Sequence, residues 1–173
     1  MTNDRIGNII ASLTLEEKAS LASGKSFWET QDIPAKGVPS IWLADGPHGL
    51  RTQDQERDDP NHSRKAVCFP AGCSAAASFD PDLARREGAA IGREARAFGV
   101  GVVLGPAINI KRSPLCGRNF EYYSEDPVLA GELAAGYING VQSQGVGTSI
   151  KHFAANSQEY RRMSASSDMT ERT

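Results

Sequence analysis

Short apolar runs alternate with longer amphipathic stretches along this chain. The apolar runs cover residues 40–45, 100–104 and 147–151, and glycine, proline or polar residues flank them. Runs of this length predict buried strands, and the spacing of apolar positions over residues 81–98 and 127–145 predicts two helices. The order strand, helix, strand, helix, strand predicts parallel strands joined by crossover helices, as in an α/β barrel or a doubly wound sheet.

Local signals mark where helices begin and end. Asp80-Pro81 and Asp126-Pro127 each place aspartate at the N-cap and proline at the first helical position. Gly99 is a typical C-terminal stop for the first of these helices. Thr14-x-x-Glu17 fits a capping box, which predicts a helix near the N-terminus.

Two further segments carry weaker signals. Asp168-x-x-Glu171 has the spacing of a capping box, which predicts that another helix starts there. Residues 51–74 are polar with little periodicity, which predicts a long loop.

Composition excludes several classes of partner. The net charge of −2 gives no reason to expect binding to nucleic acid or to an anionic membrane. No run of apolar residues reaches transmembrane length, and no signal peptide is recognisable, so we expect a cytoplasmic protein. No phosphate-binding loop or dinucleotide fingerprint lies between a strand and a helix, so we expect no cofactor.

The sequence also gives no support for a metal site. The chain has three cysteines, Cys68, Cys73 and Cys116, and no pair has the spacing of zinc ligands. We expect them to be small buried apolar residues. A zinc site built from Asp45, His48 and His152 would lack a paired-ligand motif, so we expect none.

Polar side chains follow all three predicted strands. Asp45 ends the first strand and Arg51 follows it, Arg118 lies in the segment after the second, and Lys151 and His152 end the third. Barrels and doubly wound sheets both place their sites at the carboxyl ends of the strands. A carboxylate, guanidinium, ammonium and imidazole that converge there suit the hydroxyls of a sugar ring.

Each of these groups also has a simpler structural interpretation. Asp45 alone could cap the following turn, and Lys151 and His152 alone could form a surface pair. Arg118 could pair with Glu121, three residues further along the chain.

Several motifs in a fixed order extend this picture over nearly the whole chain. They are Leu13-Thr-Leu-Glu-Glu-Lys18, Asp45-Gly-Pro-His-Gly-Leu-Arg51, Phe69-Pro70, Gly105-Pro-Ala-Ile-Asn109, Gly117-Arg-Asn-Phe-Glu-Tyr-Tyr-Ser-Glu-Asp-Pro127, Lys151-His-Phe-Ala-Ala-Asn156 and Gln158-Glu159. In this order and spacing, the chain resembles glycoside hydrolase family 3, the β-glucosidase group.

The resemblance implies a fold, an activity and a set of site residues. The fold is the N-terminal portion of a (β/α)8 TIM-like barrel, and the activity is removal of terminal β-D-glucosyl residues with retention. The residues that match the family's sugar-binding positions are Asp45, Arg51, Arg118, Lys151 and His152. Ala154-Ala-Asn156 replaces the Gly-His-Gly type segment of the family's hexosaminidases, which favours a β-glucosidase or a β-xylosidase.

The same resemblance implies that the catalytic carboxylates lie elsewhere. The family's nucleophile is an aspartate on a later barrel strand, and its acid/base lies in a second domain; neither position occurs in residues 1–173. A full barrel needs about 250 residues. We therefore expect an incomplete barrel domain over residues 1–173, inactive alone. The alternatives are a non-catalytic sugar-binding remnant and a subunit complemented by the missing C-terminal part of the enzyme.

Overall fold

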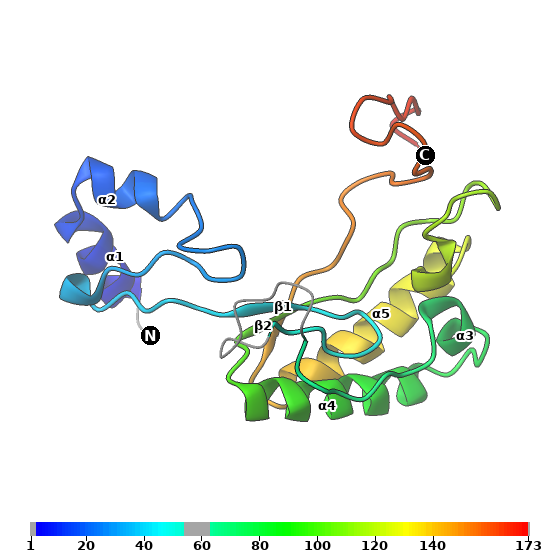
Figure 1. Cartoon of the computed structure of the whole chain (residues 1–173), viewed down its shortest axis with the longest axis horizontal. Helices are drawn as coiled ribbons and strands as arrows, with labels where there is room; N and C mark the ends of the chain where they lie inside the picture. The colour runs from blue at the N-terminus through cyan, green and yellow to red at the C-terminus, as the bar shows by residue number, and fades with distance from the viewer. Residues whose placement is uncertain (1–2, 54–62, 173) are drawn as a thin grey trace.

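Three short parallel strands form the centre of the molecule. The computed structural model describes residues 3–53 and 63–172, and Figure 1 shows its ribbon. The strands are β1 (Leu43–Asp45), β2 (Val102–Leu104) and β3 (Gly147–Thr148), and they pair in the order β1-β2-β3. Asp45 lies opposite Leu104, and Val103 lies opposite Thr148. The three chain segments therefore leave the sheet at the same edge, as the sequence predicts.

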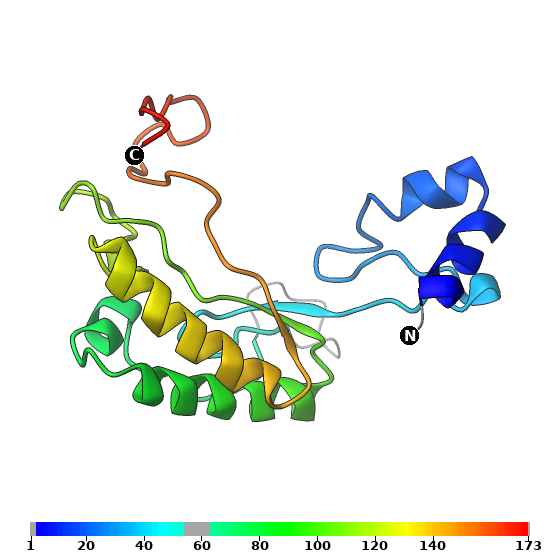
Figure 2. The ribbon, with the colours of Figure 1, turned by 180° about the vertical axis from the view of Figure 1, so that it is seen from behind.

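Two helices connect the strands and pack side by side. They are α4 (Pro81–Phe98) and α5 (Pro127–Gln142), and both views of the ribbon place them together on the same side of the strands (Figures 1 and 2). The predicted start and end of α4 and the predicted start of α5 are confirmed, whereas α5 ends at Gln142, before the predicted residue 145. The Asp80 carboxylate accepts a hydrogen bond from the Leu83 amide at 3.0 Å, and Gly99 ends α4 with a φ of 79°.

The cap of α4 gives a first testable prediction. Asp80→Ala leaves the amide of Leu83 without its acceptor, so we expect the free energy of unfolding to fall by about 1 kcal/mol. Urea unfolding followed by circular dichroism measures the change. Asp82→Ala, which removes an exposed carboxylate two residues later, is the matched control. An equal loss of unfolding free energy in both variants would show that the cap has no specific role.

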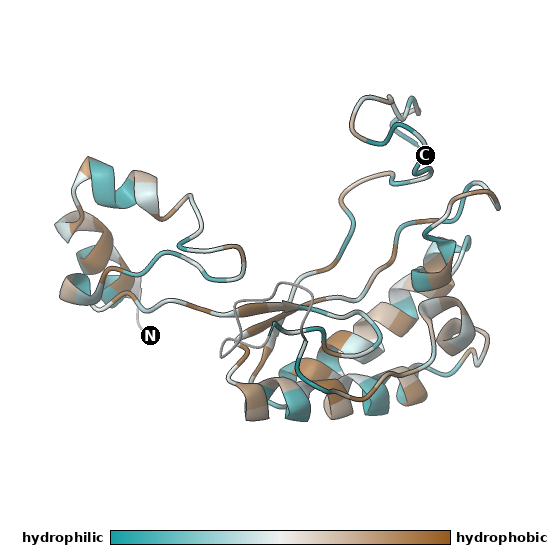
Figure 3. Ribbon diagram, in the orientation of Figure 1, coloured by the Kyte–Doolittle hydropathy of each residue, from teal (hydrophilic) through white to brown (hydrophobic). Residues whose placement is uncertain are grey.

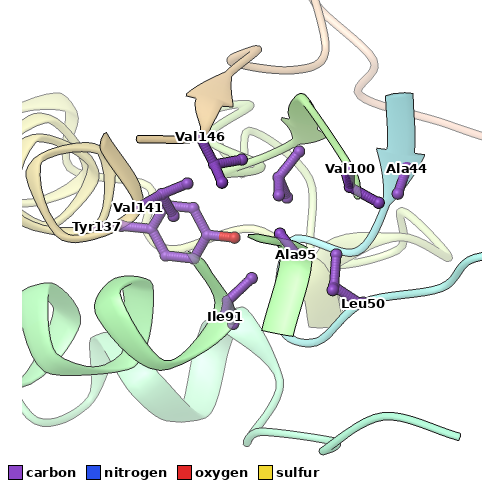
Figure 4. Close-up of a cluster of buried hydrophobic side chains, with 9 residues drawn as sticks. Ala44, Leu50, Ile91, Ala95, Val100, Tyr137, Val141 and Val146 are labelled. Atoms are coloured by element: carbon purple, nitrogen blue, oxygen red, sulfur yellow. The ribbon is translucent and has the colours of Figure 1, made fainter. Parts of the chain in front are cut away.

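The main core lies between the strands and these two helices. Its buried residues are Ala44, Leu50, Ile91, Ala95, Val100, Val103, Tyr137, Val141 and Val146 (Figure 4). Hydrophobic and hydrophilic residues alternate along α4, because only one side of this helix meets the core (Figure 3).

Glycines allow α4 and α5 to approach very closely. A Cβ atom added at Gly140 of α5 would lie 2.2 Å from the carbonyl oxygen of Arg85 in α4. One added at Gly88 of α4 would lie 2.2 Å from the carbonyl oxygen of Tyr137 in α5. Backbone of one helix therefore meets backbone of the other, and no side chain fits between them.

The N-terminal residues form a separate group of elements. Helices α1 (Asn3–Ser12) and α2 (Leu15–Ser20) and the 3-10 helix η1 (Pro34–Lys36) lie apart from α4 and α5 in both views of the ribbon (Figures 1 and 2). The predicted capping box is confirmed: the Glu17 amide donates to the Thr14 hydroxyl at 3.1 Å, and the Thr14 amide donates to the Glu17 carboxylate at 2.8 Å.

The strands are shorter than the sequence predicts. The Ile41 amide donates to the Thr30 hydroxyl at 2.8 Å, so the start of the apolar run pairs with an upstream segment, and the register of β1 with β2 begins at Leu43 and Val102. After β3 the pairing continues only as an isolated parallel bridge between Ala107 and Lys151, and Ile150 is half exposed. The predicted loop at 51–74 contains the start of helix α3 (Gly72–Ala76), and its residues 54–62 lie outside the described residues.

Two local expectations are wrong. No helix follows Asp168 in the described residues; its carboxylate accepts a hydrogen bond from the Ser166 hydroxyl at 2.6 Å and caps no helical amide. Cys116 is buried as expected, but Cys68 and Cys73 are exposed. Among the described residues, no helix combines the length and apolar character needed to cross a membrane.

Candidate functional site

An ion pair joins the ends of the first and third strands. The Lys151 ammonium donates to Oδ1 of Asp45 at 2.6 Å, and the Lys151 side chain is only 15% exposed. The backbone holds Lys151 in place, because its amide donates to the carbonyl of Pro106 at 3.1 Å and its carbonyl accepts from Ile108 at 2.7 Å. Lys151 is therefore part of an internal contact and is not one half of a surface pair with His152.

Arg51 is the second cation beside the Asp45 carboxylate. Its guanidinium lies 4.0 Å from Oδ2 of Asp45, and its amide donates to the Asp45 carbonyl at 2.8 Å. The turn over residues 46–49 brings Arg51 back beside the strand end. Asp45 thus faces one cation on each carboxylate oxygen.

A second group of contacts surrounds Arg118, which precedes the 3-10 helix η2 (Asn119–Glu121). The Arg118 Nε donates to the buried Glu121 carboxylate, so the pair suggested by their spacing is formed. Nη2 of the same guanidinium lies 3.0 Å from Nε2 of His152. Arg118 is thereby held from two sides and keeps further N–H groups for a ligand.

The two groups meet around one cavity. Asp45, Arg51 and Arg118 line a cavity of about 280 Å³ together with Glu121 and residues of the neighbouring loops, namely Gly46, Pro47, His48, Gly49 and Phe120. Lys151 and His152 are bonded to Asp45 and Arg118, and they line a second cavity of about 280 Å³. The structure therefore brings all five predicted site residues into one connected set.

The electrostatics of the site favour a charged carboxylate and a neutral imidazole. Burial raises the pKa of the Asp45 carboxyl, but the hydrogen bond and charge of Lys151, with help from Arg51, outweigh it and leave this pKa below its ordinary value. Burial and the positive charges of Arg118 and Lys151 lower the pKa of His152. At neutral pH the site therefore holds Asp45 ionised and His152 uncharged.

The shift at Asp45 predicts how stability depends on pH. A carboxyl with a lowered pKa in the folded state stabilises the fold above its ordinary pKa, near 4, and this stabilisation is lost as the pH falls through the folded-state value. We expect Asp45→Asn to flatten the dependence of the unfolding free energy on pH below about pH 5. Urea unfolding across this range is the measurement, with Asp82→Asn as an exposed control. An unchanged slope for Asp45→Asn would contradict the expectation.

The structure adds residues that the sequence does not single out. The Tyr122 hydroxyl lies 2.9 Å from Nδ1 of His152, and the Asn156 side-chain amide donates to that hydroxyl at 2.8 Å. Asn109 holds the backbone of Asn156, donating to its carbonyl at 3.0 Å and accepting from its amide at 2.8 Å. The only sequence signal for these residues is that they lie within the motifs quoted above, which give them no role.

Comparison with known proteins decides the family. Residues 1–168 match the model of the glycosyl hydrolase family 3 N-terminal domain. The chain belongs to glycosyl hydrolase family 3. The family resemblance predicted from the motifs is thus confirmed, and so is its classification among glycoside hydrolases.

Relatives in family 3 align with almost all of the chain. It is 57% identical over 170 residues to thermostable β-glucosidase B of Acetivibrio thermocellus, covering 97% of this chain and 22% of that protein. It is 50% identical over 157 residues to an exo-α-(1→6)-L-arabinopyranosidase of Bifidobacterium longum, covering 89% of this chain and 21% of that protein. The chain therefore spans about a fifth of the length of these relatives.

Solved family 3 structures share the fold. β-Glucosidase 3B of Thermotoga neapolitana in complex with glucose superposes with a TM-score of 0.82 at 45% identity, covering 92% of this chain and 24% of that protein. The predicted fold class is confirmed: the chain is part of a TIM-barrel-like α/β domain with parallel strands.

Proposed function

We propose that this chain supplies the sugar-binding groups of a retaining exo-β-glucosidase. Asp45, Arg51, Arg118, Lys151 and His152 form the subsite that holds the terminal sugar. The chain by itself does not turn over substrate, because the nucleophile and the acid/base belong to the remainder of the whole protein. Retaining glycosidases need those two carboxyl groups about 5–5.5 Å apart across the scissile bond.

The observation that carries this proposal is the connected set of polar groups at three strand ends. Asp45 is held by Lys151 at 2.6 Å, and Arg118 is held by His152 at 3.0 Å, so acceptors and donors are fixed before a ligand arrives. Each hydroxyl of a sugar both donates and accepts, and a carboxylate beside an ammonium and a guanidinium satisfies both roles. Such contacts contribute to catalysis when they strengthen in the transition state.

The relatives define which sugars deserve comparison. Thermostable β-glucosidase B of Acetivibrio thermocellus favours β-D-glucosides for this chain, whereas the arabinopyranosidase of Bifidobacterium longum at 50% identity favours α-L-arabinopyranosides as the second candidate. A β-D-xyloside is the third substrate to compare, because xylose lacks the hydroxymethyl group of glucose.

A chimeric enzyme tests the proposal directly. This chain replaces the aligned 170 residues of β-glucosidase B of Acetivibrio thermocellus, and hydrolysis of aryl β-D-glucoside, β-D-xyloside and α-L-arabinopyranoside is measured. We expect the glucoside to have the highest kcat/KM, and we expect the isolated chain to show no turnover. A folded chimera that hydrolyses none of these glycosides, or turnover by the isolated chain, would overturn the proposal.

A further inference from the structure

His152 uses both of its ring nitrogens within the protein. Nε2 lies 3.0 Å from Nη2 of Arg118, and Nδ1 lies 2.9 Å from the Tyr122 hydroxyl. A guanidinium carries donors only, so Nε2 must present a lone pair to Arg118. The single proton of the neutral ring is then on Nδ1, and Nδ1–H donates to Tyr122.

The opposite assignment fails on the same contacts. If the Tyr122 hydroxyl donated to Nδ1, the ring proton would sit on Nε2 and face an N–H of Arg118 at 3.0 Å. A doubly protonated ring would make the same donor-to-donor contact. Burial and the charges of Arg118 and Lys151 also lower the pKa of His152, which is consistent with a neutral ring.

The Tyr122 hydroxyl has a second protein partner. The side-chain amide of Asn156 donates to Tyr122 at 2.8 Å and to Oε1 of Glu159 at 3.0 Å. Because an ionised carboxylate only accepts, the contact with Glu159 fixes which side of the Asn156 amide carries the N–H groups. Tyr122 is fully buried, so its hydroxyl depends on these protein partners.

We propose that Tyr122 is a positioning residue that holds His152 as the Nδ1–H tautomer. Nε2 of His152 then accepts from Arg118, which lines the cavity. If the proposed function is correct, His152 orients the guanidinium so that the remaining N–H groups of Arg118 are left for a sugar hydroxyl. Tyr122 thus acts on the sugar through His152 and Arg118 without touching it.

Nitrogen NMR of the chain tests the tautomer without any ligand. Long-range ¹H–¹⁵N correlation distinguishes a protonated from an unprotonated ring nitrogen, and the chain has only three histidines, so His152→Gln assigns the signal. We expect His152 to be protonated at Nδ1 at neutral pH. Protonation at Nε2 in the unaltered chain would overturn the proposal, whatever happens to any variant.

Two tyrosine variants test whether Tyr122 favours the Nδ1–H tautomer of His152. In Tyr122→Phe, the ratio of Nδ1–H to Nε2–H tautomers should fall by about tenfold, because the acceptor for Nδ1–H is lost. Tyr123→Phe is the matched control: Tyr123 is the next residue and is also buried, but it packs with Leu133 and Ala134 in the second core cluster. An unchanged ratio in folded Tyr122→Phe, or an equal change in both variants, would overturn the positioning role.

The chimera separates this inference from the proposed function. If the chimera is active, Tyr122→Phe should lower kcat/KM more than Tyr123→Phe does. The contrasting result is an inactive chimera, with His152 protonated at Nδ1 and a lower share of that tautomer in Tyr122→Phe. In that case the proposed function fails and the positioning role stands.

Discussion

Replacing Gly140 with alanine is expected to lower the free energy of unfolding by about 3 kcal/mol, the upper part of the range for overpacking. The new Cβ would lie 2.2 Å from the Arg85 carbonyl oxygen and 2.7 Å from the Ala89 amide nitrogen. Both neighbours are backbone atoms within α4, so no side-chain rotation relieves the overlap. The two helices must separate, and the core between them and the strands loses contacts.

The same substitution elsewhere in α5 is the natural control. An alanine Cβ at Gly131 meets nothing within 4 Å, so Gly131→Ala should stabilise the helix by up to about 1 kcal/mol through the higher helix propensity of alanine. Urea unfolding followed by circular dichroism compares the variants. If Gly140→Ala were as stable as Gly131→Ala, the close approach of α4 and α5 would be wrong.

The second large effect concerns activity. In the chimera, Lys151→Met is expected to lower kcat/KM for an aryl β-D-glucoside by about a hundredfold, the effect of losing a charged hydrogen bond at the reacting sugar. The variant keeps the length of the side chain but removes the ammonium that lies 2.6 Å from Asp45. Steady-state kinetics of the purified chimera measures the change. Lys18→Met, at an exposed lysine of α2 far from the cavity, is the control and should change little.

A double-mutant cycle shows whether Lys151 acts together with Asp45. Asp45→Asn alone is also expected to lower kcat/KM strongly, because the asparagine keeps the shape but loses the charge. Residues in direct contact are not additive, so the double variant should lose less than the product of the two single losses. Additive losses in the cycle would mean that the ion pair is not what organises the site.

Local signals explain why the helices were predictable. Asp80-Pro81 and Gly99 act on the backbone within a few residues, and the structure places the ends of α4 at these positions. Strand limits depend on partners elsewhere in the chain. Residues 41–44 are apolar throughout, yet Ser40 and Ile41 pair with Thr30, which no local pattern reveals.

The candidate site also combines features that the sequence predicts with contacts that depend on distant parts of the chain. The strand-end rule places Asp45 and Lys151 on one edge, and the family resemblance adds Arg118, but neither predicts the contact between Tyr122 and His152. That contact depends on how η2 and the chain after β3 fold back toward each other, because the partners are 30 positions apart in the sequence. A tyrosine within a motif does not by itself indicate which atom it touches. The wrong helix at Asp168 has a similar cause, since its carboxylate is engaged by Ser166.

The ion pair between Asp45 and Lys151 has a consequence for the order of folding. Its partners are 106 residues apart, and both crossover helices lie between them. Closing a loop of that length costs chain entropy before any contact is gained, so the pair forms only after α4 and α5 have brought the strands together. We therefore expect the site to be among the last parts of the molecule to assemble.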